Sequence, residues 1–522
     1  MQAKRLSIGV GALVMAAALI MLIFSDRLSS NAKRSETETD SERPELTWFT
    51  YNPAGTPLPP PETDVVRKAI EAKFRVRLNL IAWPPGRDYQ TQYVGLLMAN
   101  NAPDFGIDLS PDGGSSLILE GVYADLTPFV SPATMPNYFK YWMTEQELRQ
   151  YQIHNRFVRA PVPYDRNVYR SYYIRKDWLD RLGLPVPESY EQYVETLRAF
   201  TFRDPDGNGR QDTYGFTTSG NGRQLSDEWP EFVKNGLLYP AYMENNRLID
   251  MKSDPRVGLV VDDILRVMKE GLADPDWFLN QDNEHIEKAV RGKAGIVMGT
   301  TRRFAFDSNP SSVQARGKEA DSSANWIPFN PFGANRPLGT FTEAGLPFMF
   351  PKAAADRHPE NVKKTIEILD WLCGEEGFLL THYGLEGKHY TRSGNIVTLL
   401  PSSNAMTERD AWSGWSFFTP DSPSQLGLTV IDPRMTDHDK AIDDFLARLP
   451  VKEKLGTFLI PPQEIDVAIF RAKLDEMHIK MLYSDKSGAR WPEYREEALA
   501  DYYGDWILQY YENQVRTARG TK

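Results

Sequence analysis

The sequence predicts an α/β protein of two domains that contains at least one parallel sheet. Between residues 46 and 109, short runs that alternate like strands are followed by stretches with helical apolar spacing. Strands joined through helices pair in parallel by right-handed crossovers. The chain has 522 residues, which is more than one hydrophobic core normally supports, so we expect two lobes.

The first sheet is expected from three strands and two helices. Strands are predicted at 46–51, 76–80 and 104–109, and Thr63 is expected to cap the helix that ends near residue 74. A second helix is predicted at 89–97. In open α/β sheets, ligands bind at the carboxyl edge of the strands. The residues expected to form this rim are Trp48, Tyr51, Asn52, Trp83, Arg87, Asp108 and Asp112.

A calcium loop is predicted directly after a helix that a capping box of Ser189 and Gln192 introduces. Side-chain oxygens fall at positions 1, 3, 5 and 9 of this loop and glycine at position 6, as in known calcium loops. Position 12 is Gly215 instead of glutamate, so further ligands must come from Asp212, from water or from elsewhere in the fold. The expected ligands are Asp204, Asp206, Asn208, the carbonyl of Arg210, and Asp212.

The alternative for this loop is a metal-free surface turn, because Asp, Asn and Gly gather in any tight turn. The loop contains no His or Cys, so a transition metal is disfavoured. Residues 214–218 alternate like a strand and not like a second helix. Calcium is therefore expected to stabilise the fold and not to act as a switch.

The first 28 residues predict export. Lys4 and Arg5 precede an apolar run from residue 7 to residue 24. The run is long for a signal-peptide core and short for a membrane span, so a cleaved signal peptide and an uncleaved anchor both fit; we favour the anchor. Residues 29–43 have almost no apolar content and predict a flexible tether. The body is then expected at the extracellular face of the membrane or secreted.

Composition excludes several classes of protein. Hydrophobic residues make up 41% and charged residues 25%, which is an ordinary globular balance. The net charge of −11 disfavours a nucleic-acid partner. Cys373 is the single cysteine, so no intrachain disulfide is expected and no cysteine lies near the export segment to carry a lipid. Nucleophile elbows, phosphate loops and HExxH motifs are absent from the sequence.

Aromatic residues at predicted loops indicate a carbohydrate ligand. Pyranose rings pack their C–H faces on aromatic rings and need paired donors and acceptors for their hydroxyls. Most large aromatics pack in cores, so those next to Pro, Ser or Gly carry more weight. Arginines at the end of a strand would favour hydroxyl-rich or acidic sugars, although a solvated turn is the alternative. The candidates are Trp83, Trp229, Trp412, Trp415, Arg302, Arg303 and Glu343, with Trp48, Trp277 and Trp326 in the wider pool.

Four segments carry a resemblance to a known family: Gly121–Pro128, Tyr172–Pro187, Gly292–Gly299 and His358–Gly377. Over most of residues 44 to 400 the chain resembles the extracellular solute-binding proteins of ABC transporters, in particular the large branch that binds oligosaccharides and alginate. The predicted calcium loop resembles one at the same place in that branch. The family pattern often has an acidic residue where Thr213 stands here, and many relatives are lipoproteins.

The resemblance implies a periplasmic-binding-protein-like fold of two α/β lobes that close on a ligand in the cleft between them. Residues 44–165 and 340–395 are assigned to the first lobe, and 166–339 and 396–522 to the second. The implied function is a non-catalytic receptor that delivers a carbohydrate to an ABC-type permease. The alternatives are an exported glycosidase, which needs two carboxylates across a cleft, and a sugar sensor or adhesin of the same architecture.

Overall fold

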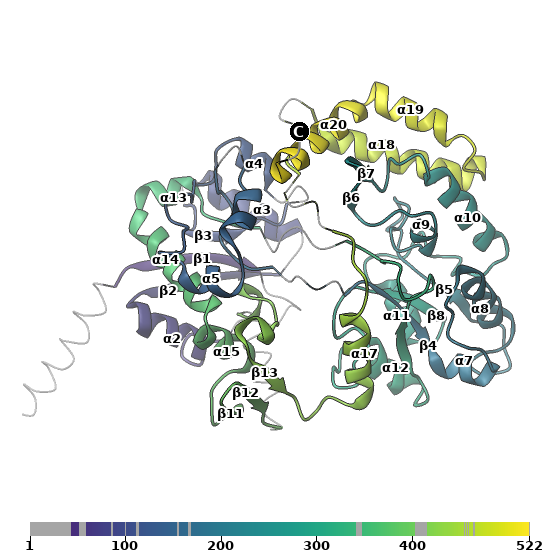
Figure 1. The fold of residues 1–522 in the computed structure, drawn as a ribbon, viewed down its shortest axis with the longest axis horizontal. Helices are drawn as coiled ribbons and strands as arrows, with labels where there is room; N and C mark the ends of the chain where they lie inside the picture. The colour runs from purple at the N-terminus through teal and green to yellow at the C-terminus, as the bar shows by residue number, and fades with distance from the viewer. Residues whose placement is uncertain are drawn as a thin grey trace, which may run out of the picture.

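The protein forms two lobes that lie side by side and are joined across the middle by extended segments (Figure 1). Each lobe has its own hydrophobic cluster, one around Trp48 and Phe348 and the other around Tyr172 and Trp277. The two-lobed α/β fold expected from the sequence is confirmed. The computed structural model describes residues 43–51, 59–84, 87–99, 101–110, 114–153, 156–164, 167, 169–340, 347–401, 415–453, 455, 457, 459–462 and 465–520.

The predicted N-terminal hydrophobic helix and the tether lie outside these residues, apart from Arg43 at the end of the tether. Among the helices that the structure does describe, none combines the length and the apolar character needed to cross a bilayer.

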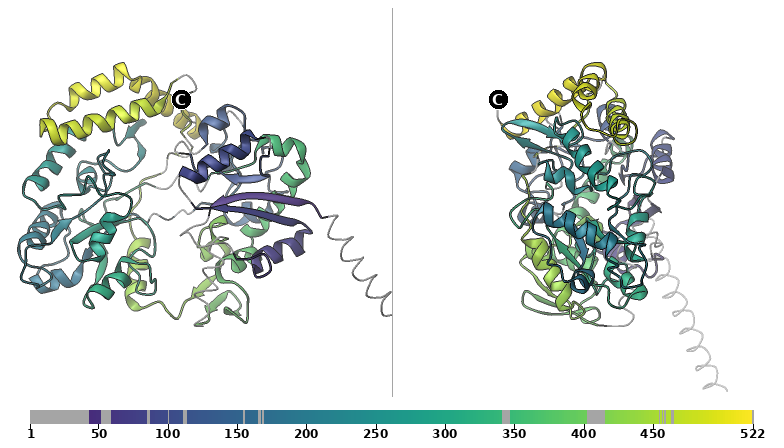
Figure 2. Two further views of the ribbon diagram at one scale, coloured as in Figure 1. Left: turned by 180° about the vertical axis from the view of Figure 1, so that it is seen from behind. Right: turned by 90° about the vertical axis from the view of Figure 1, so that its right-hand side faces the viewer.

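The first lobe contains a four-stranded sheet in the order β10-β3-β1-β2. The three strands expected from the sequence pair in parallel, with Trp48 opposite both Leu80 and Phe105. A fourth, antiparallel strand comes from much later in the chain. The carboxyl ends of β1 and β2 point toward the middle of the molecule (Figure 2). The strands are β1 (Glu45–Tyr51), β2 (Arg77–Trp83), β3 (Phe105–Ile107) and β10 (Phe348–Met349).

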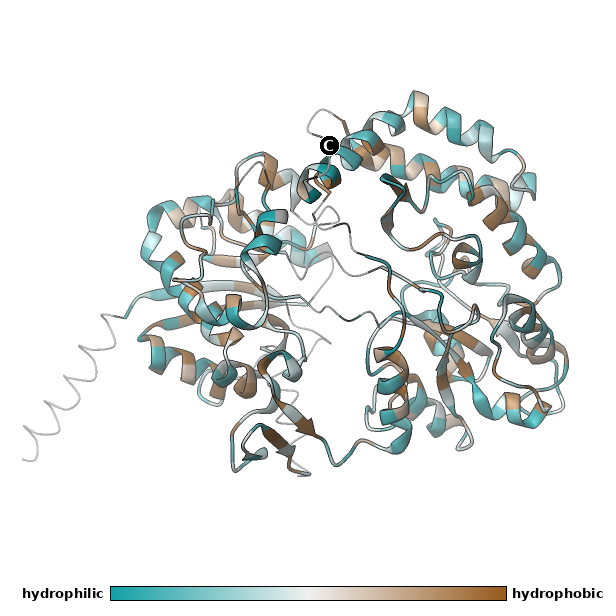
Figure 3. Ribbon diagram, viewed as in Figure 1, coloured by the Kyte–Doolittle hydropathy of each residue, from teal (hydrophilic) through white to brown (hydrophobic). Residues whose placement is uncertain are grey.

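Two helices make the crossovers of this sheet, α2 (Val65–Phe74) and α3 (Arg87–Met98). The cap of α2 is Asp64 and not the expected Thr63, because the Asp64 carboxylate accepts the N–H groups of Val66 and Arg67. The Thr63 hydroxyl instead donates to the carbonyl of Pro60. Helices that cover a sheet are expected to be amphipathic, and Figure 3 shows apolar and polar residues mixed along each of them.

The second lobe contains a mixed sheet in the order β5-β8-β4-β9. Every residue of β4 is buried, and β4 pairs antiparallel with both of its neighbours. Ser189 caps α8 as expected, but the Gln192 side chain accepts from the N–H of Glu188 and so does not complete the capping box. The elements are β4 (Ser171–Arg175), β5 (Tyr214–Phe216), β8 (Ala294–Gly299), β9 (Trp326–Phe329), α7 (Lys176–Leu182), α8 (Tyr190–Phe202) and α10 (Val257–Lys269).

Residues 396–401 and 415–428 belong to the first lobe, whereas the sequence analysis assigned them to the second. Val397, Phe418 and Leu426 are buried in the first cluster. The apolar character of this stretch matches either core, so the sequence alone does not decide the boundary. The chain returns to the second lobe only after a small sheet of β11 (Tyr390–Ser393), β12 (Ile396–Leu399) and β13 (Thr429–Ile431), and enters α17 (Asp437–Ala447).

Three C-terminal helices complete the second lobe, and the last of them ends beside the first lobe (Figure 1). These are α18 (Val467–Lys480), α19 (Trp491–Asp501) and α20 (Gly504–Arg519). The remaining elements are α4 (Ser115–Leu119), α5 (Pro136–Tyr141), α6 (Glu145–Gln150), α9 (Pro230–Lys234), β6 (Ala241–Glu244), β7 (Arg247–Asp250), α11 (Glu284–Val290), α12 (Val313–Ala320), α13 (Lys352–Arg357), α14 (Pro359–Cys373), α15 (Glu375–Tyr383), η2 (Ser416–Phe418), η3 (Pro423–Leu426) and η4 (Met481–Asp485).

A carboxyl group lies inside the core of the second lobe. Glu231 is fully buried, and its Oε1 accepts a hydrogen bond of 2.8 Å from the Tyr190 hydroxyl. Burial, only partly offset by this hydrogen bond, raises the pKa of Glu231 to about 7. The unfolded chain ionises this group near its ordinary pKa. Its contribution to stability is therefore present at acid pH and is lost as the pH rises through 7.

We predict that Glu231→Gln makes stability less dependent on pH. The amide keeps the shape and cannot ionise, so the variant should exceed the wild type in free energy of unfolding by on the order of 2 kcal/mol at pH 8 and match it at pH 5. Urea unfolding at the two pH values measures this difference. Glu244→Gln, at a side chain that is 41% exposed, is the control and should show no such difference. Equal stability of Glu231→Gln and wild type at pH 8 would refute the assignment.

Candidate ligand site between the lobes

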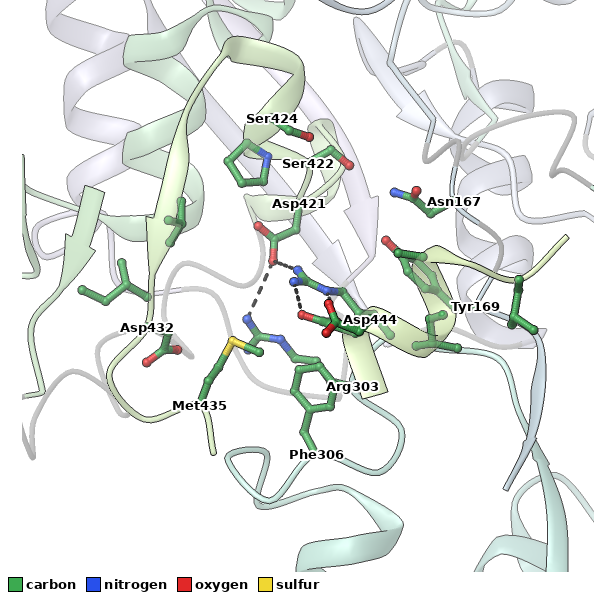
Figure 4. A pocket seen from close by; sticks show the side chains of 18 of the residues that line it. Asn167, Tyr169, Arg303, Phe306, Asp421, Ser422, Ser424, Asp432, Met435 and Asp444 are labelled. Atoms are coloured by element: carbon green, nitrogen blue, oxygen red, sulfur yellow. Dashed lines mark hydrogen bonds and ion pairs between the residues drawn. The ribbon is translucent and has the colours of Figure 1, made fainter. Parts of the chain in front are cut away.

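A cavity of about 460 Å³ lies between the lobes, next to two of the segments that join them. Its first-lobe wall includes Tyr383, at the end of α15, and Asp421, between η2 and η3. The second-lobe wall includes Arg302 and Arg303, which follow β8. Tyr169, in the segment that leads from the first lobe into β4, also lines the cavity (Figure 4). The cavity thus takes side chains from both lobes and from a joining segment.

Arg302 is held in place by helix α17. Its Nε and Nη2 donate to the two carboxylate oxygens of Asp443 at 2.8 and 2.6 Å, a two-pronged geometry that fixes the plane of the guanidinium. This pairing also raises the pKa of Arg302 above its already high value. The side chain is one third exposed. Arg302 is therefore a fixed positive charge at the cavity wall, and two of its five N–H donors are directed at Asp443.

Asp421 faces both arginines from the opposite lobe. The Tyr383 hydroxyl donates to its Oδ1 at 2.6 Å, while its Oδ2 lies 3.7 Å from Arg302 Nη1 and 3.7 Å from Arg303 Nη2. Burial opposes ionisation of Asp421, but His382, Arg303, the Tyr383 hydrogen bond and Arg302 outweigh it and hold the pKa of this carboxyl below its usual range. Asp421 is therefore a carboxylate at neutral pH.

The cavity lining carries more negative than positive side chains. Asp421, Asp432, Asp443 and Asp444 line it, against the two arginines. Carboxylates accept hydrogen bonds from hydroxyl donors, and the rings of Tyr169, Tyr383 and Phe306 offer apolar faces. The lining therefore suits a neutral, hydroxyl-rich ligand. The sequence analysis named hydroxyl-rich or acidic sugars for these arginines, and the choice between the two stays a prediction.

Three tryptophans expected at the ligand site lie in the cores instead. Trp48 and Trp415 are each 1% exposed and pack 6.5 Å apart in the first core. Trp229 is fully buried, 5.2 Å from Trp277 in the second core. Trp229 precedes Pro230 at the start of α9, so a ring next to a loop-forming residue still points inward. Trp326, from the wider pool, is also buried.

The carboxyl edge of the first sheet carries other predicted residues. Trp83 is 36% exposed at the end of β2, and Tyr51 pairs with it across β1 and β2. Arg87 begins α3. Asp108 is buried and accepts a hydrogen bond of 2.6 Å from the hydroxyl of Tyr123, so one of its oxygens is already occupied within the protein. Four candidates lie outside the described residues: Asn52, Asp112, Glu343 and Trp412.

Sequence reasoning missed Tyr383, Asp421 and Asp443. Asp421 lies between Pro and Ser residues, a pattern typical of a plain turn, and Asp443 lies among other acidic residues of a surface helix. Only the fold brings these two residues to Arg302, because Asp421 follows it by 119 residues and Asp443 by 141 residues in the sequence. No local signal in the chain could have identified them.

The predicted calcium loop gathers its carboxylates around one amide. The Asn208 side-chain amide donates to Asp206 Oδ2 at 2.7 Å and to Asp212 Oδ1 at 3.1 Å, and the N–H of Gly209 donates to Asp204 Oδ2 at 3.0 Å. Positive φ angles at Asp204, at Gly207 and at Gly209 make this tight path possible. The N–H of Arg210 donates to Asn208 Oδ1 at 2.7 Å. The loop therefore turns its oxygens inward.

The charges of this loop are crowded. Burial raises the pKa of Asp206, the backbone N–H of Asn208 lowers it, and the nearby Asp204 and Asp212 raise it further. A hard divalent cation would relieve this repulsion, so the residues present fit calcium. The Lys293 ammonium, 2.6 Å from Asp212 Oδ2, supplies part of the compensation and would compete for that oxygen.

A second acidic group, Asp307, His438 and Asp439, has ligand atoms close enough to share an ion; it is the one such group found among the residues that the structure describes. Its oxygens already have partners. Asp307 accepts from the Lys318 ammonium at 2.6 Å, and Asp439 accepts from the N–H groups of Asp307 and Ser308 at 2.6 and 3.2 Å. We interpret this group as the capped start of α17.

Known proteins related to the chain are binding proteins wherever their names state a role. No family model matches the chain. It is 25% identical to the lipoprotein LipO of Bacillus subtilis (strain 168) over 414 residues. This alignment covers 75% of this chain and 78% of LipO. It is 24% identical over 359 residues to the polygalacturonan/rhamnogalacturonan-binding protein YtcQ of the same organism, 64% of each chain. Over 151 residues it is 28% identical to the fructooligosaccharide ABC transporter substrate-binding protein FusA of Streptococcus pneumoniae, 27% of this chain and 26% of FusA.

The chain is therefore similar in sequence to binding proteins, one of which is named as a substrate-binding protein of an ABC transporter. Solved structures of such proteins share its fold. An HMO-binding solute-binding protein from Bifidobacterium longum infantis superposes with a TM-score of 0.68 at 15% identity, over 92% of this chain and all of that one. FusA in complex with kestose gives a TM-score of 0.63 at 16% identity, with the same coverage. A further FusA structure, of an EF-hand mutant in complex with fructo-nystose, also gives 0.63 at 16% identity and the same coverage. These relatives are binding proteins and not enzymes.

We predict that Asp64→Ala destabilises the first lobe. Asp64 caps α2, and its Oδ2 also accepts the indole N–H of the buried Trp415 at 2.9 Å. Loss of the cap and of a partner for a buried donor should cost about 2–3 kcal/mol in free energy of unfolding. Chemical denaturation followed by tryptophan fluorescence measures this cost, and Glu62→Ala at the exposed neighbouring position is the control. An unchanged midpoint would show that Asp64 does not hold Trp415.

Proposed function

We propose that the protein is an extracellular substrate-binding protein that captures an oligosaccharide between its lobes and delivers it to an ABC-type permease. The observation that carries the proposal is a polar, partly aromatic cavity whose walls come from both lobes. The relatives YtcQ and FusA bind saccharides according to their names, which supports a carbohydrate as the ligand here.

A ligand that touches both walls would favour the closed arrangement of the lobes, because it gains contacts there that the open arrangement lacks. Two of the segments that join the lobes contact the same second-lobe residue, Tyr239. The Thr340 hydroxyl donates to the carbonyl of Tyr239 at 2.9 Å, and the N–H of Lys452 donates to the carbonyl of Gly339 at 3.2 Å. The guanidinium of Arg170, which directly precedes β4, lies 5.2 Å from the centre of the Tyr239 ring.

For the N-terminus, we propose attachment to the outer face of the cell membrane through the apolar run of residues 7–24, with residues 29–43 as a spacer. A tethered receptor stays close to its permease, which raises its effective concentration there. Cleavage of this run would instead release the protein. The relative LipO is a lipoprotein by name, which supports a location at the membrane.

We further propose that calcium binds the loop of Asp204, Asp206 and Asp212 and stabilises the second lobe. Asn208 would turn its amide oxygen toward the ion, and the carbonyl of Arg210 would complete the set. The relative FusA has an EF-hand, since one of its solved structures is of an EF-hand mutant. The ion would bind beyond the end of α8 and away from the inter-lobe cavity, so its role would be structural.

We predict that an oligosaccharide closes the lobes without being changed. Donor and acceptor dyes at Lys68→Cys and Lys269→Cys report the distance between the lobes, because both positions are exposed and the native Cys373 is buried. Calorimetry of the full chain against a panel of neutral and acidic oligosaccharides identifies the ligand, which should then raise energy transfer. Chromatography of the recovered sugar should show no cleavage. Cleaved glycosidic bonds would favour an exported glycosidase, and the absence of any saccharide binding would refute the proposal.

We predict that calcium raises the melting temperature of the wild type and not that of the double variant Asp204→Asn, Asp206→Asn. Binding to the folded state alone stabilises by mass action, by about 2.7 kcal/mol at one hundred times the dissociation constant. Differential scanning calorimetry with calcium and with chelator measures the shift. A control double variant, Asp276→Asn with Asp437→Asn, removes two exposed carboxylates elsewhere and should keep the response. A wild type that melts at the same temperature in chelator would exclude the structural role.

A further inference from the structure

Asp421 stands where an acidic ligand would have to place its own carboxylate. Its Oδ2 is 3.7 Å from a guanidinium nitrogen of Arg302 and from one of Arg303, across the inter-lobe cavity (Figure 4). Charge-assisted hydrogen bonds are shorter, about 2.7–2.9 Å. The contact is therefore an ion pair whose nitrogen–oxygen distances are too long for a direct hydrogen bond.

The two arginines differ in what else holds them. Arg302 is already bound by Asp443, whereas the charge partner found for Arg303 in the described part of the chain is Asp421. Arg303 is 41% exposed and lines the cavity. It is thus the cation best placed to attract a carboxylate from solution, and Asp421 is the group that neutralises it.

Asp421 is anchored in the first lobe. The Tyr383 hydroxyl holds its Oδ1 at 2.6 Å, and the neighbouring Phe418 and Leu426 are buried in the first-lobe core. The arginines follow directly on β8, in the sheet of the second lobe. A change in the angle between the lobes must therefore change the 3.7 Å separations.

We propose that Asp421 is a built-in counter-ion with two linked effects: it draws the lobes together through Arg302 and Arg303, and it selects neutral over acidic saccharides at this end of the cleft. This proposal rests on the function proposed above. It identifies Asp421 as a residue that determines ligand specificity and not only as part of the cavity wall.

The selection follows from the charges that an acidic sugar would meet. To reach Arg303, its carboxylate must approach Asp421, with Asp444 in the same lining. The Asp432 carboxylate, also in the lining, is already compensated by Arg434, which donates to both of its oxygens at 2.8 and 2.6 Å. Like charges a few ångströms apart in a partly buried site repel each other, and the arginines are already compensated. A neutral sugar keeps the Asp421 ion pair and donates its hydroxyls to the carboxylate oxygens.

The first test uses no sugar. In the dye-labelled protein with Lys68→Cys and Lys269→Cys, raising the salt from about 0.05 M to about 0.5 M screens the ion pair and should shift the population toward the open form by about three- to fivefold. Asp421→Asn keeps the shape and the Tyr383 hydrogen bond but removes the charge, so it should be open at both salt concentrations. Asp437→Asn removes an exposed carboxylate of the second lobe that does not line the cavity, and it should respond like the wild type.

The second test measures selection with two probes that differ by one carboxylate, galactose and galacturonate. Asp421→Asn should bind galacturonate at least about tenfold more tightly than the wild type does, whereas galactose should bind less tightly, because the variant lacks the carboxylate that accepts its hydroxyls. Adding Arg303→Gln to Asp421→Asn should abolish this gain, because the Arg303 guanidinium is the group that donates to the sugar carboxylate. Calorimetry at low salt measures both affinities.

The proposal is overturned if salt leaves the wild-type lobe distance unchanged, or if galacturonate binds the wild type as well as it binds Asp421→Asn. Failure of the proposed function gives a different result. In that case no oligosaccharide binds the wild type, while the salt response of the labelled protein and its loss in Asp421→Asn remain measurable.

Discussion

The separation of apolar residues into two clusters is the constraint on which the rest of the structure depends. Trp48 and Phe348 belong to one cluster, and Tyr172 and Trp277 to the other. Because each lobe buries its own core, little apolar surface is needed to hold the lobes together. The space between them is left to polar side chains such as Arg302, and hydrogen-bonded groups at the hinge such as Thr340 define where the lobes can turn.

The charges between the lobes follow a consistent arrangement. One positive side chain, Arg302, is fixed by a carboxylate of its own lobe, and a second, Arg303, faces a carboxylate of the other lobe. The carboxylates that remain around the cavity can accept hydroxyl donors. Under the proposed function, the same side chains would take part in ligand recognition and in the contact between the lobes.

The sequence was sufficient for the parts of the fold that depend on local patterns. The parallel pairing of β1, β2 and β3 followed from alternation and helical spacing, and the turn that gathers Asp204 and Asp206 followed from residue types at fixed positions. Local patterns do not determine which core an apolar stretch joins. Residues 396–401 and 415–428 were assigned to the wrong lobe for that reason, since Phe418 and Leu426 would suit either core.

The candidate site was harder to predict than the fold. Arg302 and Arg303 could be selected because charged residues stood at the end of an apolar strand, and both do line the cavity. The partners of Arg302 could not be selected, because Asp421 and Asp443 have ordinary turn and surface-helix surroundings in the sequence. Trp229 and Trp415 show the opposite failure: a neighbour typical of loops does not stop a large ring from pointing into a core.

The late position of β10 in the chain has a consequence for biosynthesis. This strand completes the first sheet, and α14 with residues 396–401 and 415–428 adds to its core. All of them follow the sheet of the second lobe in sequence. The amino-terminal third of the polypeptide is therefore synthesised before β10, α14 and the later core residues of the first lobe are present. It must wait, with apolar surface uncovered, until more than two hundred further residues have emerged, so a holding chaperone is most useful during that interval.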